Sequence, residues 1–146
     1  MQTLSDHILD IAQNSIRAQA SRVEIELQEN ITKDSLVITI RDNGCGMDET
    51  TVAKVTDPFF TSRTVRKVGL GIPLFKQNAE ATGGTLKIKS KPGEGTTIEA
   101  SFGLLHWDRP PMGDIAGSIV ILVSANPEIN FIYRHTTEKG EYTFDT

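Results

Sequence analysis

Hydrophobic positions recur at helical spacing through residues 3–19 and predict an amphipathic helix. At about 100° per residue, its polar side chains fall into one row that spans roughly 80° of the helix circumference. The row is either a solvated helix face or the edge of a site that combines an acid, an amide and a cation. Its members are His7, Asp10, Asn14 and Arg17, and the opposite side carries Leu4, Ile8, Ile11, Ala12, Ser15 and Ala18.

Two hairpins are predicted where apolar and polar residues alternate with a period of two. Residues 21–27 and 36–40 flank a polar turn and form the first pair of strands. Residues 85–90 and 96–102 flank the turn KPGEG and form the second pair.

Helical segments separate the two hairpins. A short helix begins at Asp48 or Glu49 and ends near Val55. Residues 57–69 follow neither period and predict a long loop, with paired aromatic residues at one end and cations at the other.

A further helix is predicted over residues 72–82, with Pro73 in its first turn and two glycines at its end. Strand pairs separated by helices favour an α+β architecture, in which a mostly antiparallel sheet carries helices on one face.

The pattern changes after Phe102, where HWDRPPMGD has the composition of a linker. The apolar run IAGSIVILVSANP is either a helix capped by Asp114 or a strand, and we favour the helix. A last hairpin is predicted around TTEKG. We therefore expect a domain over residues 1–103 and a C-terminal extension over 104–146, and a chain that stops directly after a hairpin is consistent with truncation.

Composition narrows the function classes. The chain has 146 residues and a net charge of −4, which argues against a general nucleic-acid-binding protein. We expect no signal peptide, because the first predicted helix contains Asp6 and Asp10 and no apolar core run, and the longest apolar run, 119–123, is too short to cross a bilayer. The one cysteine, Cys45, excludes an intrachain disulfide. We expect a cytoplasmic protein with no membrane segment.

Two glycine-containing segments carry candidate chemistry. DNGCGM at 42–47 places Asp42 directly after a strand, where its carboxylate can accept a hydrogen bond from an exocyclic amine. GLGIP at 69–73 places glycines at a predicted helix start, where free backbone N–H groups favour phosphate. Each segment alone is a weak signal, since an ordinary turn explains it equally well.

Taken in order, the segments DIAQNSIRA, DNGCGM, DPFFTSR, VGLGI and the closing hairpin with GEGTT resemble the ATP-binding domain of one superfamily. This is the Bergerat-fold superfamily of gyrase, the ninety-kilodalton heat-shock chaperone, histidine kinases and mismatch-repair ATPases. The resemblance covers about residues 3–103 and is closest to histidine-kinase catalytic domains. It implies a two-layer α/β sandwich with a mobile lid over Mg-ATP.

The resemblance also implies roles for individual residues. Asp42 would read the adenine amine with support from Thr96 through water, Asn14 would ligate Mg²⁺, and Asp10 stands where hydrolysing members carry a glutamate base. Arg17 stands where histidine kinases often carry a lysine toward the phosphates. The nucleotide-contacting set implied is Asn14, Arg17, Asp42, Gly44, Gly46, Met47, Phe60, Thr61, Arg63, Lys67, Val68, Gly69, Leu70, Gly71 and Thr96.

Some residues depart from the pattern or fall outside it. Lys67 stands where the second glycine box usually begins with another glycine, and Asp10 is one methylene shorter than glutamate. We expect His7 to be the solvated end of its row, Cys45 to be a small packed side chain, and Trp107 with its neighbouring prolines to anchor the extension.

Three functions remain open at this point. The chain is a kinase-type domain that passes the γ-phosphate to a partner protein, on histidine or serine; or an ATP-hydrolysing switch; or a nucleotide sensor without turnover. We favour the kinase type. A protein partner is expected in each case, and a homodimer is compatible with all three.

Overall fold

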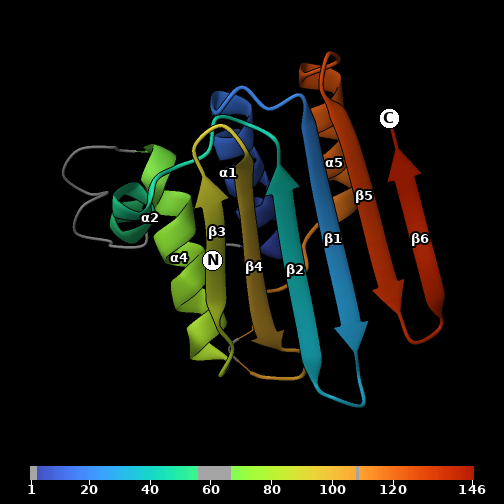
Figure 1. The fold of residues 1–146 in the computed structure, drawn as a ribbon. Coiled ribbons are helices and arrows are strands. Elements are labelled where there is room, and N and C mark those ends of the chain that lie inside the picture. Colours follow the sequence, from blue (N-terminus) through green and yellow to red (C-terminus); the bar gives the residue numbers. More distant parts are fainter. Residues whose placement is uncertain (1–2, 56–66, 108) are drawn as a thin grey trace.

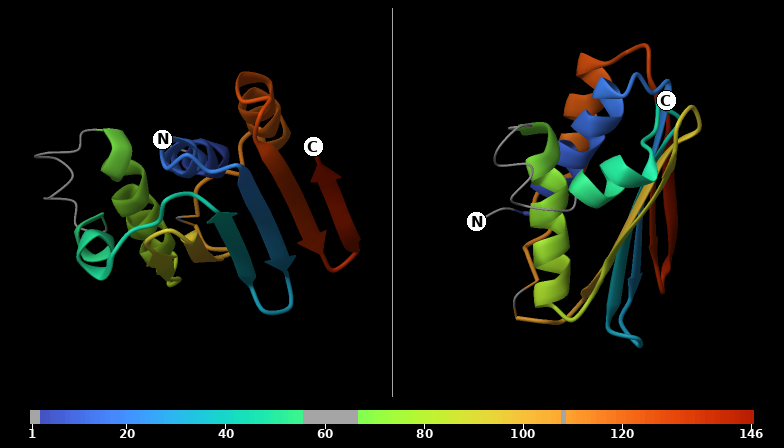
Figure 2. Two further views of the ribbon diagram at one scale, coloured as in Figure 1. Left: turned by 45° about the horizontal axis from the view of Figure 1, so that its top comes forward. Right: turned by 60° about the vertical axis from the view of Figure 1, so that its left-hand side comes forward.

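A computed structural model describes residues 3–55, 67–107 and 109–146, with the side chains of 67–71 left undescribed. In these residues six strands form one sheet in the order β3-β4-β2-β1-β5-β6, and the helices lie on one face of it (Figures 1 and 2). Neighbouring strands are antiparallel, except that β1 and β5 are parallel. The predicted mostly antiparallel sandwich is confirmed. The strands are β1 Arg22–Asn30, β2 Ser35–Asp42, β3 Leu86–Lys91, β4 Gly95–Gly103, β5 Asn130–Thr137 and β6 Gly140–Asp145.

The first helix, α1 (Leu4–Arg17), begins at a capping box. The Thr3 hydroxyl accepts a hydrogen bond from the Asp6 N–H, and the Asp6 carboxylate accepts one from the Thr3 N–H. Leu4 and Ile8 are fully buried on the face that meets the sheet. The helix predicted over 3–19 is therefore confirmed.

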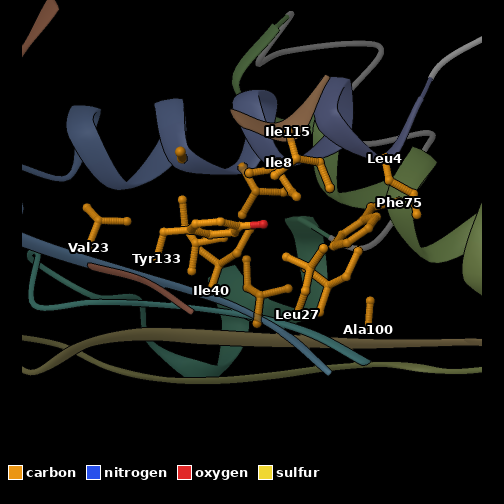
Figure 3. Packing of buried hydrophobic residues seen from close by; sticks show 14 of the residues in the cluster. Leu4, Ile8, Val23, Leu27, Ile40, Phe75, Ala100, Ile115 and Tyr133 are labelled. Carbon is orange, nitrogen blue, oxygen red and sulfur yellow. The ribbon is translucent and has the colours of Figure 1, made fainter. Parts of the chain in front are cut away.

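Alternation along the strands separates the core from solvent. Ile25, Ile40 and Ile98 occupy opposite positions on β1, β2 and β4, and all three are buried beneath the helices. Figure 3 shows Tyr133 and Phe75 in the same apolar layer, between α1 and the sheet. Both predicted hairpins are present with their expected antiparallel pairing.

Helix α2 (Glu49–Val55) follows the prediction, whereas α4 (Lys67–Ala81) begins five residues before its predicted start at 72. Pro73 therefore lies inside the helix and not in its first turn. Glycines at 69 and 71 suggest a boundary in the sequence, but a helix tolerates each glycine at a cost of about 1 kcal/mol. Residues 67–69, expected in a loop, are helical.

Residues 104–146 belong to the same sheet and core. Helix α5 (Ile115–Ala125) begins at the N-cap Asp114, as expected, and packs beside α1, while β5 pairs with β1 (Figure 1). The predicted hairpin around TTEKG is β5–β6.

One expectation for this segment is wrong for Trp107 and holds for the neighbouring prolines, since Pro110 is buried. Trp107 is 99% exposed and does not anchor the segment. That role falls to the backbone of Pro111 and Met112, whose carbonyls accept hydrogen bonds from the N–H groups of Leu4 and Ser5.

Candidate functional site

A cavity of about 240 Å³ lies between the C-terminal half of α1, the end of β2 and the start of β4. Predicted site residues that line it together are Asn14, Arg17, Asp42, Gly46, Met47 and Thr96. The rest of the wall is mostly apolar: Ile11, Ser15, Ala18, Cys45, Val55, Ile72 and Ile98. Segments far apart in the sequence thus converge on one hollow with few polar groups, as in most small-molecule sites.

A larger hollow, of about 620 Å³, lies on the other side of Asp42 and Thr96, between α2 and the β3–β4 hairpin. Its walls include the charged residues Glu49, Lys89 and Glu94, and Asn14 is not among them. We place the site in the smaller cavity because the predicted polar residues and the apolar wall meet there.

The Asp42 carboxylate is fixed by two hydrogen bonds. The Ser15 hydroxyl donates to Oδ2 at 2.6 Å, and the Gly44 N–H donates to Oδ1 at 2.9 Å. Each carboxylate oxygen keeps a further lone pair for a ligand. The helical pattern groups Ser15 with the apolar side of its helix, so sequence reasoning missed this role. Its position directly after Asn14 is the signal that could have revealed it.

The loop after β2 is held by its own backbone. Gly46 has φ +72°, and a Cβ there would collide with the Lys91 carbonyl oxygen. The Cys45 N–H donates to Ala18, and the Cys45 carbonyl accepts from Gly93. Close packing within the chain therefore requires glycine at position 46. Cys45 itself is exposed, so the expectation of a packed side chain is wrong: these bonds use its backbone and leave its thiol at the surface.

Asn14 carries an unusual polar atom. Its Oδ1 is buried and has no hydrogen-bond partner among the described residues, and Asn14 is one of the residues that line the cavity. An unpaired buried acceptor costs free energy unless a ligand satisfies it, and an amide oxygen suits a hard cation such as Mg²⁺. No cluster of three or more His, Cys, Asp or Glu residues suited to a metal occurs in the described part of the chain. Asn14 therefore fits a metal whose other ligands come from phosphate and water.

The remaining members of the polar row on α1 differ in position. Arg17 lies at the cavity wall, and its residue as a whole is exposed. Asp10 is exposed one turn before Asn14 and does not line the cavity.

Thr96 is the Cα partner of Asp42 across β2 and β4. Its hydroxyl lies 2.8 Å from the Ser90 hydroxyl, which also accepts a hydrogen bond from the Met47 N–H. Ser90 therefore links two predicted site residues and was not foreseen.

Helices α1 and α4 run antiparallel to each other (Figure 1). Asn78 near the end of α4 meets His7 near the start of α1, while Ile72 shares the cavity wall with Asn14. The first turn of α4 therefore points toward the cavity end of α1. Gly69 and Leu70 are among its first four residues, whose N–H groups have no partner within a helix, whereas Gly71 lies one residue beyond them.

Of the other predicted nucleotide-contacting residues, Phe60, Thr61 and Arg63 lie outside the described residues, as do the side chains of Lys67 and Val68.

His7 is 0% exposed, so the expectation of a solvated end is wrong. Helix α4 covers this face, which the local periodicity of α1 could not reveal. His7 Nε2 lies 2.7 Å from Asn78 Nδ2, and the ring packs against Phe75 with centroids 5.0 Å apart. Burial lowers the pKa of His7 to about 4, against a small opposing effect of Asp6.

The chain is similar to known proteins in sequence and in fold. The sequence model of the family described as "Histidine kinase-, DNA gyrase B-, and HSP90-like ATPase" matches residues 2–106. The chain is 36% identical over 96 residues to the signal transduction histidine-protein kinase AtoS of Escherichia coli, covering 65% of this chain and 16% of that protein. It is 37% identical over 94 residues to the sensor protein kinase FleS of Pseudomonas aeruginosa, covering 64% and 23% respectively. The chain thus spans less than a quarter of the length of either relative.

Solved structures share the fold. The N-terminal domain of a DNA repair protein superposes with a TM-score of 0.69 at 17% identity, over 100% of this chain and 53% of that one. The MutL ATPase domain of Aquifex aeolicus, complexed with ADP, gives a TM-score of 0.56 at 17% identity, over 97% and 62%. Among the described helices, none combines the length and the apolar character that a membrane span requires. The resemblance inferred from the motifs is confirmed, and the chain belongs to the family of histidine kinase-, DNA gyrase B- and HSP90-like ATPases.

Proposed function

We propose that the 240 Å³ cavity binds Mg-ATP, with the adenine at Asp42 and the metal at Asn14. The observation that carries the proposal is that two residues with suitable groups line the same cavity. Asp42 has a carboxylate fixed by two hydrogen bonds, and Asn14 has a buried amide oxygen with no hydrogen-bond partner within the described ranges. The first offers acceptors to an amine, and the second offers a ligand to a hard cation.

At the adenine end, the bonds from Ser15 and Gly44 hold the Asp42 carboxylate in place before a ligand arrives. The exocyclic amine of adenine would donate to Asp42, and Thr96 would support that contact through water. Apolar side chains such as Ile98 and Met47 would lie against the base. Preorganised acceptors cost little ordering entropy on binding.

At the phosphate end, Arg17 supplies a cation, and the first turn of α4 supplies backbone donors at Gly69 and Leu70. The proposed set of phosphate-contacting residues also includes Lys67, Val68, Gly71 and the predicted lid residues Phe60, Thr61 and Arg63. Mg²⁺, when bound, neutralises phosphate charge.

We favour transfer of the γ-phosphate to a side chain of a partner protein, since the sequence relatives are named as sensor kinases. Hydrolysis is the second candidate, and the fold match to a MutL ATPase domain over nearly the whole chain supports it. Asp10 would then orient water, whereas in a kinase it would orient the acceptor. A domain that uses ATP in either way would act in the cytoplasm.

The test compares the dependence of ATP affinity on Mg²⁺ in three proteins. The wild type should bind ATP more tightly with Mg²⁺ than with EDTA. Asn14→Ala should bind ATP equally under both conditions, while the neighbouring exposed amide variant Gln13→Ala should behave like the wild type. If Asn14→Ala kept the wild-type gain in ATP affinity on addition of Mg²⁺, Asn14 would not be a ligand of the metal.

Phosphate release from Mg-ATP then separates the two reactions. Release that is lost in Asp10→Asn, with binding retained, favours hydrolysis. Binding without release favours transfer to a partner or a sensor without turnover.

A further inference from the structure

The buried His7 of α1 forms a polar contact with the half-buried Asn78 of α4, beside apolar side chains. The Nε2 and Nδ2 atoms are 2.7 Å apart, and the neighbouring Phe75 and Ala79 are fully buried. The site described above uses neither residue.

The direction of this hydrogen bond follows from its atoms. The Asn78 amide nitrogen can only donate, so Nε2 of His7 accepts and the ring proton resides on Nδ1. That Nδ1 is buried, and no other residue within 3–55, 67–107 or 109–146 forms a hydrogen bond with it. The pair therefore has one favourable alignment, since sliding one helix along the other would leave the second ring nitrogen of the buried His7 unpaired as well.

The contact lies on the same two helices that line the cavity. Along α1, Asn14 is seven residues from His7, or about 10 Å. Along α4, Ile72 is six residues from Asn78, or about 9 Å, in the opposite direction of the chain. An axial shift of α4 at Asn78 would consequently move its first turn by the same amount relative to Asn14.

We propose that His7 is a positioning residue: its hydrogen bond with Asn78 sets the axial position of α4 against α1, and so the span that Mg-triphosphate must bridge. A single polar contact in an apolar helix interface can fix register in this way. The inference rests on the proposed nucleotide site. The adenine end does not depend on it, because the donors to Asp42 come from α1 and from the loop after β2.

The experiment measures the affinities of the full chain for Mg-ATP and for adenosine. Asn78→Leu removes the hydrogen bond, and Gln77→Leu is the matched change at the adjacent, exposed position of α4. We expect Asn78→Leu to weaken Mg-ATP binding about fivefold and to leave adenosine binding unchanged, since one hydrogen bond is worth about 1 kcal/mol. Gln77→Leu should change neither. Equal losses for both ligands, or no loss for either, would overturn the proposal.

A second variant guards against a folding defect in the first. His7→Phe combined with Asn78→Leu replaces the polar pair by an apolar one and keeps the ring against Phe75. The same selective loss of Mg-ATP affinity is expected, and wild-type selectivity in this variant would contradict the positioning role. If the wild type bound neither ligand, the proposed function would fall first, which separates the two failures.

Discussion

The Ser15 hydroxyl donates a 2.6 Å hydrogen bond to Oδ2 of Asp42. The residue before it, Asn14, lines the cavity that Asp42 also lines, and its buried side-chain oxygen has no hydrogen-bond partner in the part of the chain that the structure describes. Two adjacent residues of α1 therefore act at opposite ends of the proposed nucleotide site: Ser15 holds the adenine-binding carboxylate, and Asn14 is the proposed metal ligand. The orientation of α1 positions both side chains.

Replacing Ser15 by alanine should weaken ATP binding by roughly tenfold, because the Asp42 carboxylate loses a charge-assisted donor worth about 1.5 kcal/mol. Isothermal titration with Mg-ATP measures the change. Ser118→Ala is the control, since Ser118 is also a buried helical serine but lies on α5 and outside the cavity wall. Equal affinities in Ser15→Ala and Ser118→Ala would show that the bond does not hold Asp42 for the ligand.

Gly46→Ala should destabilise the fold more than Gly83→Ala. Both glycines have positive φ, at +72° and +82°, so both variants carry backbone strain of about 1 kcal/mol or more. The Cβ at position 46 would also collide with the Lys91 carbonyl, whereas nothing lies within 4 Å of one at position 83. Urea unfolding of the two variants measures the difference in the free energy of unfolding. Matching losses would mean that the loop relaxes away from β3.

The free energy of unfolding should decrease as the pH is lowered, because His7 is buried in its neutral form. Its pKa is about 4 in the folded chain and 6.5 for an exposed imidazole, so below pH 6.5 the unfolded chain takes up a proton that the folded chain refuses. This loss develops between pH 6.5 and 4 and reaches about 3 kcal/mol at most.

Urea unfolding of the wild type and His7→Phe across this range isolates the effect from other titrating groups. The free energy of unfolding should decline less steeply in the variant, which keeps a ring against Phe75. Parallel declines would indicate that His7 gains its proton at a similar pH in both states.

Local pattern predicts most elements of the fold because each buries one face. The apolar positions of α1 and the alternation along β1, β2, β3 and β4 reflect a single sheet covered on one side, so period and burial agree. Asn14, Asp42 and Thr96 could be assigned to one site because the motif order suggested their convergence, and all three line the same cavity.

The errors concern features that depend on contacts distant in the sequence. Periodicity makes His7 look solvated because α4, some 70 residues later, covers it. Ser15 looks like part of the apolar face because its partner lies at the end of β2. The predicted start of α4 is too late because its glycines were interpreted as a helix boundary. A packed helix tolerates glycine inside it at a cost of about 1 kcal/mol each.

Asp42 offers the most direct test of the account, through its preference for an amine donor. Titration of the wild type with Mg-ATP and Mg-GTP should give clear binding of ATP and weak binding of GTP, because guanine presents an oxygen where adenine presents its amine. Asp42→Asn should lose about a hundredfold in ATP affinity, as expected for a charge-assisted bond worth close to 3 kcal/mol. Glu99→Gln, the same chemical change at an exposed position of β4, should bind ATP as the wild type does. Equal binding of ATP and GTP, or undiminished ATP binding by Asp42→Asn, would contradict the assignment of this cavity to adenine.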